Sequence, residues 1–169
     1  GRETVDASQI VLYLYHEAPQ RVMRNQAIYN IALEIPPGAK NHGDKTYYEF
    51  EREATLYSLF PPAHFRGKSS DFTLRYPGGK EEKLLSVPKF DFNWQHTYTL
   101  KQPRTVPAGT RLILSTRFDN SVENVANPDP TKTVFWGEQS FEEMLWGTVT
   151  YTWADETSTA PTHSRQRSE

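Results

Sequence analysis

The chain has 169 residues, which is enough for one domain with a substantial core and rather short for two. Its formal net charge is -2 with both signs interspersed, which argues against a general binder of nucleic acid or of anionic membranes. The longest apolar run, residues 10–15, is far shorter than the roughly 20 residues of a membrane helix, so we expect no direct membrane insertion. Cysteine is absent, which excludes disulfides, thiol catalysis and Cys-based metal sites but leaves the compartment open.

The beginning of the chain predicts a polar leader or linker followed by two strands. The sequence starts with Gly1 and shows no apolar targeting segment, so we expect a processed protein or a piece of a longer one. Residues 1–8 are polar and are expected to form a leader or linker. Residues 10–16 (I-V-L-Y-L-Y-H) are rich in β-formers, and residues 27–35 alternate among Ile, Asn, Ala and Glu, so each run predicts a strand.

Short strand-like runs separated by Gly and Pro turns make up the rest of the chain. The turn Pro77-Gly78-Gly79 predicts a hairpin between the runs that flank it, and residues 41–44 predict another turn. Ser140-x-x-Glu143 fits a capping box and predicts one helical turn. Residues 155–169 are rich in Ser, Thr and Arg and predict a flexible tail. The remaining predicted strands are residues 46–50, 55–60, 71–76, 83–87, 91–100, 111–118 and 145–153.

This succession of short strands predicts an all-β fold. We expect a single antiparallel β-sandwich of the jelly-roll type over residues 9–154. Residues 118–144 form an unusually long connection, and loops of more than about 12–15 residues are usually functional or disordered. Apolar residues such as Val134 and Trp136 indicate that this one is ordered. We expect the fold to bring it against a second polar centre, residues 61–68 (P-P-A-H-F-R-G-K).

An ordered series of motifs extends through most of the chain. It comprises H-F-R-G-K-S from His64, Y-P-G-G-K, L-L-S-V-P-K-F-D-F-N-W-Q, P-A-G-T, F-D-N-S-x-x-N, N-P-D-P, W-G-E-Q, and E-E-M ending at Met144. From about residue 10 to residue 153, this series resembles the C-terminal half of the copper type II, ascorbate-dependent monooxygenases. The likeness is greatest to the bacterial branch of the peptidylglycine α-hydroxylating and dopamine β-hydroxylating family.

The resemblance implies a copper site. Members of this family resemble one another in having two jelly-roll domains, of which the N-terminal one passes electrons through a three-histidine copper and the C-terminal one hydroxylates a C–H bond. The copper of the second domain is held by an H-x-H pair and a methionine, which implies His64 and Met144 as metal ligands here. The family pattern resembles P-H-M-H-L-R-G-K, so Pro62 stands where the first histidine is expected. Proline offers no side-chain donor to a metal.

Several roles for polar residues stay open. Imidazole and thioether ligands suit Cu(I), and His96 or His42 could substitute for the ligand lost at Pro62. Arg66 and Lys68 could hold an anionic substrate group, although such residues more often form a solvated strand end or an ion pair. Acidic and amide side chains of the long loop could bind calcium, but hydrogen bonding within the loop is favoured. These side chains are Asp119, Asn120, Asn124, Asn127 and Asp129.

Two functional hypotheses from different classes follow. The first is a copper-dependent monooxygenase-like domain, the C-terminal half of a larger oxidoreductase, with weakened or lost metal binding. The second is a non-catalytic β-sandwich that serves as a structural or interaction module in a multidomain or multisubunit assembly. Pro62 favours the second hypothesis for this chain in isolation, whereas the retained His64 and Met144, with the surrounding motifs, favour the first for its ancestry. We assign no catalytic residue, expect other domains or subunits as partners, and expect a periplasmic or extracellular location from the resemblance.

Overall fold

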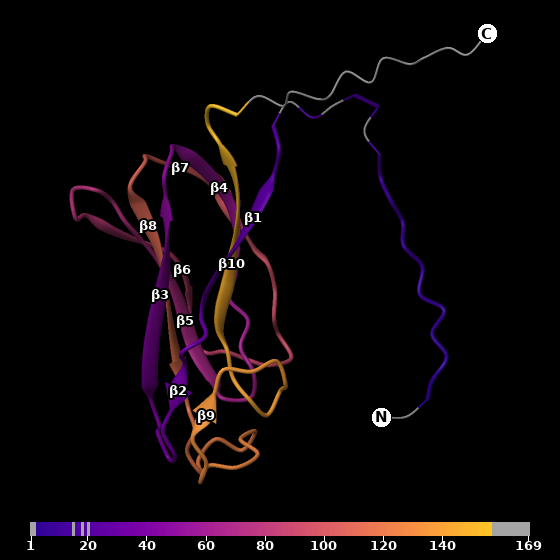
Figure 1. Cartoon of the computed structure of the whole chain (residues 1–169), viewed down its shortest axis with the longest axis vertical. Helices are drawn as coiled ribbons and strands as arrows, with labels where there is room; N and C mark the ends of the chain where they lie inside the picture. Colours follow the sequence, from indigo (N-terminus) through magenta and orange to yellow (C-terminus); the bar gives the residue numbers. More distant parts are fainter. Residues whose placement is uncertain (1–2, 15, 18, 20, 157–169) are drawn as a thin grey trace.

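The computed structural model describes residues 3–14, 16, 17, 19 and 21–156 of the chain (Figure 1). These residues form ten strands and contain no helix that could span a membrane. The predicted tail at residues 155–169 lies outside the described residues from position 157 onward. The strands are β1 (Arg24–Asn30), β2 (Glu34–Ile35), β3 (His42–Phe50), β4 (Ala54–Phe60), β5 (Gly67–Arg75), β6 (Glu81–Val87), β7 (Tyr98–Val106), β8 (Thr110–Phe118), β9 (Val134–Phe135) and β10 (Leu145–Trp153).

The strands form two four-stranded sheets and a two-stranded ribbon. One sheet has the order β1-β10-β4-β7, the other has the order β3-β8-β5-β6, and β2 pairs with β9. The strands of all three pair in antiparallel fashion. Figure 1 shows β2 and β9 at one end of the sandwich. Eight strands distributed over two sheets in this order are a jelly roll, so the predicted all-β fold is confirmed.

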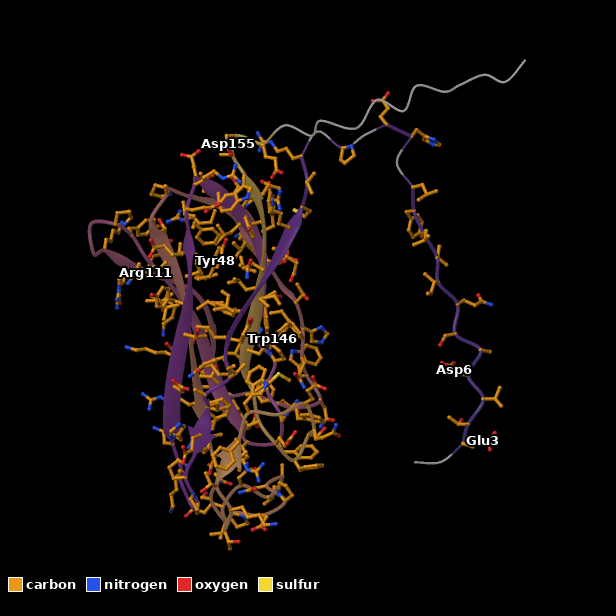
Figure 2. All side chains as sticks on the ribbon, in the orientation of Figure 1. Glu3, Asp6, Tyr48, Arg111, Trp146 and Asp155 are labelled. Carbon is orange, nitrogen blue, oxygen red and sulfur yellow. The ribbon has the colours of Figure 1, made fainter. Side chains whose placement is uncertain are left out.

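The core lies between the two sheets and follows from the period-two alternation of strand side chains. In β8 every second residue is buried, including Leu112 and Phe118. β5 adds Phe72 from the same sheet, and the opposite sheet supplies Leu56 and Val149. Figure 2 shows side chains filling the space between the sheets. Full burial of one such side chain stabilises the fold by about 1.5–3 kcal/mol.

The strand predicted at residues 10–16 is wrong at the described positions 10–14 and 16, and position 15 lies outside the described residues. Residues 10–14 have no strand structure, and their apolar side chains are exposed, from 69% at Val11 to 93% at Tyr13. The first strand of the sandwich begins only at Arg24. β-propensity mainly records how well a side chain packs on neighbouring strands, and this run has no neighbouring strand in the described part of the chain.

Local hydrogen bonds explain why the strand predicted at residues 27–35 is divided into β1 and β2. The side-chain oxygen of Asn30 accepts a hydrogen bond from the amide of Ala32 at 3.0 Å. The side-chain nitrogen of Asn30 donates to Asp44 at 2.8 Å. Such short-range bonds compete with strand pairing and close a turn.

The turn predicted at residues 41–44 is wrong beyond residue 41, because His42 already pairs with Phe118 in β3.

The strand predicted at residues 91–100 begins later than expected. Residues 91–97 have no strand structure, and the Asp91 carboxylate accepts a hydrogen bond from the Asn93 amide at 2.9 Å. This Asx-type turn delays the start of β7. β7 then continues through Pro103. Proline has no N–H to donate to a neighbouring strand, and it is tolerated here because β7 lies at the edge of its sheet.

Gly147 of β10 offers a test of the packing between the sheets. A Cβ atom at this position would lie 2.9 Å from Leu114 Cδ2 and 2.9 Å from Phe72 Cζ. Overpacking of this kind costs about 1–3 kcal/mol, so Gly147→Ala is expected to lower the free energy of unfolding by that amount in urea titrations. Gly78→Ala is the matched control, because a Cβ at Gly78 meets nothing within 4 Å. Equal stability of the two variants would contradict this packing.

Candidate functional site

The two polar stretches singled out in the sequence meet at one end of the sandwich. The Asp119 amide donates to the Arg66 carbonyl at 2.8 Å. The side-chain nitrogen of Asn124 donates to the Phe65 carbonyl at 3.0 Å. The segment after β4 is therefore bonded to the long connection between β8 and β10, as predicted. The same connection is ordered, because its β9 pairs with β2.

The carboxyl group of Glu143 joins the two stretches. Its side chain is 0% exposed, and Oε2 accepts hydrogen bonds from the amides of His64 (2.9 Å) and Met144 (3.0 Å). Oε1 accepts the Arg66 amide at 2.7 Å. Burial raises the pKa of Glu143 to about 7, against the opposing effect of these three amides. A single buried group thus fixes three backbone positions.

Arg66 is the second buried charged group of this region, with 2% exposure. Its Nε donates to the side-chain oxygen of Asn120 at 2.8 Å, and its Nη1 donates to the Phe141 carbonyl at 2.8 Å. Its Nη2 lies 3.4 Å from the Asp129 carbonyl. Burial lowers the pKa of Arg66, and the carboxylates of Glu143 and Asp129 counteract it. In the described part of the chain the guanidinium forms no ion pair.

Asn120 shows how the amides of the long loop are used. Its side-chain oxygen accepts from Arg66 and from Asn127 (3.0 Å), and its nitrogen donates to the carbonyls of Pro36 and Lys132 at 2.9 Å each. Asp129 accepts from the amide and hydroxyl of Thr131 in the same manner. These bonds confirm the predicted hydrogen bonding within the loop. They leave the calcium alternative without support.

The capping box predicted at residues 140–143 is wrong. The reciprocal bonds occur one position earlier, where the Gln139 amide donates to Glu142 Oε2 at 3.0 Å and the Glu142 amide donates to the Gln139 carbonyl at 2.9 Å. The result is a turn and not a helix. Glu143 cannot cap it, because its carboxyl group is engaged by His64, Arg66 and Met144. The sequence carries no signal for its role, because the amides of His64 and Arg66 are 79 and 77 residues away along the chain.

Met144 lines an aromatic cleft of about 370 Å³ on the outer side of the β1-β10-β4-β7 sheet, the face that carries Trp146. Pro62 lies in the wall of this cleft, and Glu138 is its carboxylate. His64 is not among the lining residues. Its Nδ1 is buried and has no hydrogen-bond partner among the residues that the structure describes, and burial lowers the pKa of its imidazole. The other lining residues are Phe60, Trp136 and Gly137.

The predicted metal ligands are brought together only in part. The amides of His64 and Met144 share one oxygen of Glu143, so these two residues are neighbours. His42 begins β3, and the His96 ring lies 4.3 Å from the exposed Trp94 ring. Neither lines the cleft of Met144. Among the described residues no three His, Cys, Asp or Glu side chains form a metal-binding group. The assignment of His64 and Met144 as ligands stays a prediction.

Comparison with known proteins adds little. No family model matches the chain, and no curated protein matches it. Among solved structures, the chain is similar to one described as the structure of the infectious bursal disease virus Gt strain, with 10% sequence identity and a TM-score of 0.37. The match covers 79% of this chain and 32% of that chain. A similarity at this level supports no statement about function.

Glu143→Gln tests the buried carboxyl group. An amide side chain cannot accept hydrogen bonds at both ends, so at least one amide among His64, Arg66 and Met144 loses its partner. We expect the free energy of unfolding to fall by about 1–3 kcal/mol in urea titrations. Glu142→Gln is the matched control, because the variant side chain still offers an oxygen to the Gln139 amide. An equal effect of both substitutions would contradict the role of Glu143.

The stability difference between the native protein and the Glu143→Gln variant is expected to depend on pH. The pKa of Glu143 is raised in the fold from its ordinary value of 4.5 to about 7. The folded protein therefore binds more protons than the unfolded chain between these values, and its stability falls as the pH rises through this window. The stability difference between the native protein and Glu143→Gln should be larger near pH 5 than near pH 8. A difference that grows with pH would show that the carboxylate is the stabilised form.

Proposed function

We propose that this domain is a non-catalytic jelly-roll module built on a monooxygenase-like scaffold, and that it serves in a multidomain or multisubunit assembly. The observation that carries the proposal is Pro62 in the wall of the cleft that holds Met144. Pro62 and Met144 line the same cleft, and proline has no donor atom. The cleft has the shape of a site but lacks the ligand set that the resemblance implies.

The residues present do not fit a copper ion of that kind. A Cu(I) site of imidazole and thioether ligands needs its donors to converge on one point. Met144 supplies one thioether in the cleft, while His64, whose amide is bonded to Glu143, does not line it. The carboxylate of Glu138 is a hard ligand, which suits other metals better than Cu(I). We therefore derive no oxidative step through copper for this chain.

An apolar surface beside the cleft supports a role in binding other proteins. Tyr29 is 53% exposed and Ile31 is 67% exposed. The Tyr29 ring lies 6.2 Å from the ring of Trp136, which lines the cleft, so Tyr29 lies beside the cleft. Exposed apolar side chains that lie together often mark an interaction site. Partner domains or subunits, in a periplasmic or extracellular setting, complete the proposal.

Copper titration of matched variants tests the loss of the metal site. The native domain is expected to show no stoichiometric Cu(I) binding at micromolar affinity, about -8 kcal/mol. Pro62→His restores a donor beside Met144 and should tighten binding by about tenfold or more, while Pro62→Ala, which removes the same ring without adding a donor, should not.

Native binding would overturn the proposal under one condition. If the native domain binds one Cu(I) at micromolar affinity or tighter, and both His64→Ala and Met144→Ala abolish this binding, the metal site survives. Competition with a chromophoric Cu(I) chelator measures all five proteins under the same conditions. Circular dichroism of each variant checks that the fold is retained.

A further inference from the structure

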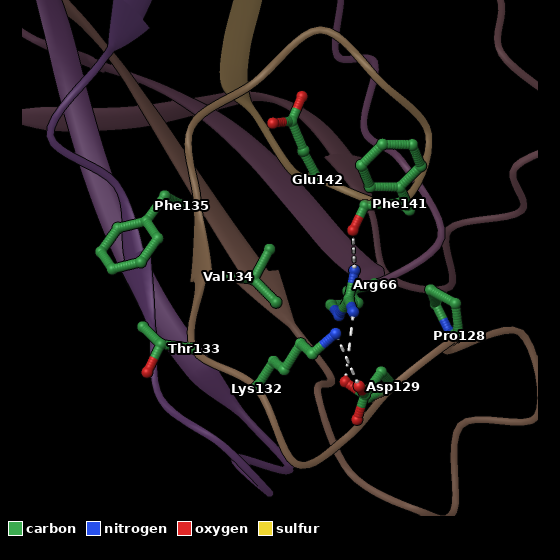
Figure 3. A pocket seen from close by; sticks show the side chains of 9 residues that line it. All are labelled: Arg66, Pro128, Asp129, Lys132, Thr133, Val134, Phe135, Phe141 and Glu142. Atoms are coloured by element: carbon green, nitrogen blue, oxygen red, sulfur yellow. Dashed lines mark hydrogen bonds and ion pairs between the residues drawn. The ribbon is translucent and has the colours of Figure 1, made fainter.

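A second hollow is lined by residues of the long connection between β8 and β10 together with Arg66 (Figure 3). It shares no lining residue with the cleft of Met144. Its volume is about 520 Å³, within the range of about 300–1,000 Å³ that is usual for small-molecule sites. Arg66 lies in its wall, and Figure 3 shows Phe141 above the guanidinium with Asp129 and Lys132 below it. Val134 and Phe135 form another part of the lining.

The guanidinium of Arg66 has two N–H groups that donate to no acceptor among the described residues. An arginine carries five N–H groups, and the three hydrogen bonds of Arg66 go to Asn120, Phe141 and Asp129. All three acceptors are uncharged carbonyl or amide oxygens, and the bond to Asp129 is long at 3.4 Å. A buried cation without a carboxylate partner carries a desolvation cost that an anionic ligand would offset. Each terminal nitrogen keeps one N–H for such a ligand.

The acidic groups of the hollow are already engaged. The Asp129 carboxylate accepts from the amide of Thr131 at 3.0 Å and lies 3.3 Å from the Lys132 ammonium. The Glu142 carboxylate accepts from the Gln139 amide. Lys132 is 76% exposed, so its ammonium can contact a ligand while it stays beside Asp129. The lining holds two carboxylates as well as two cations, so recognition of an anion depends on the remaining N–H groups of Arg66 and not on a net positive charge.

Two aromatic side chains complete the site. Phe135 and Phe141 both line the hollow, and they are 58% and 61% exposed. Exposed phenylalanine costs free energy in water, and two of them at one hollow provide apolar surface for a ligand to cover. The hollow thus combines a buried cation with an apolar rim.

We infer that this hollow binds a small organic anion, whose carboxylate meets the Arg66 guanidinium and the Lys132 ammonium and whose apolar body lies against Phe135 and Phe141. Arginine suits this role because its planar N–H groups match the two oxygens of a carboxylate. The inference is independent of copper and of the cleft of Met144. It assigns a ligand-binding function to the long loop between β8 and β10.

Titration with 3-phenylpropionate, followed by two-dimensional NMR of the full chain, tests the inference. The acid is expected to bind at one site and to shift signals of Phe135, Phe141 and the Arg66 Nε–H. 3-Phenylpropionamide has the same apolar body without the charge, and its affinity should be lower than that of the acid by about tenfold or more. Acetate has the charge without the body and should also bind more weakly than the acid.

Variants at exposed positions keep the test independent of folding. Arg66 substitutions are expected to disturb the loop, so Lys132→Ala and Phe141→Ala carry the test, and each should weaken binding of the acid several-fold. Lys101→Ala, at an exposed lysine of β7 outside the hollow, should leave it unchanged. Absence of binding at millimolar concentration, equal affinity for acid and amide, signal shifts confined to other residues, or an equal loss in all three variants would each overturn the inference.

Discussion

The buried carboxyl group of Glu143 is the interaction on which one end of this jelly roll depends. Two irregular segments meet there, and irregular backbone inside a protein needs partners for its amides. Glu143 supplies them for His64, Arg66 and Met144 at once. A fully buried carboxyl group would be costly without such donors, so the group and the amides depend on each other. The long loop is thereby held as part of the core.

This arrangement divides the surface at this end into two sites. Glu142 lines the hollow of Arg66, Met144 lines the aromatic cleft, and Glu143 is buried between them. Glu142 and Met144 are two positions apart and would share one face of a regular strand, so their different surfaces reflect the turn at residues 140–142. Pro62 lines the cleft and not the hollow. The buried cation and the aromatic rim of the hollow are therefore present whether or not the proposed loss of a metal site is correct.

The fold was largely predictable from the sequence because its signals are local. Period-two alternation located the starts of β8 and β10 within one residue, whereas β5 begins at Gly67, before the start predicted at residue 71. Predictions failed where a single side chain decides the backbone, as at Asn30 and Asp91, or where pairing is missing, as at residues 10–14. The meeting of the two polar stretches was foreseen, but Glu143 was assigned to a helix cap. Its true partners are distant in the sequence, and no periodicity reveals them.

Native-state hydrogen exchange of the His64, Arg66 and Met144 amides tests the central role of Glu143 most directly. If the carboxyl group holds both segments as part of the core, these amides exchange only through global unfolding, with protection close to that of β10 amides such as Val149. They should also share one dependence on denaturant concentration. Exchange several orders of magnitude faster than that of β10, with no denaturant dependence, would mean that the loops open on their own and would contradict the account.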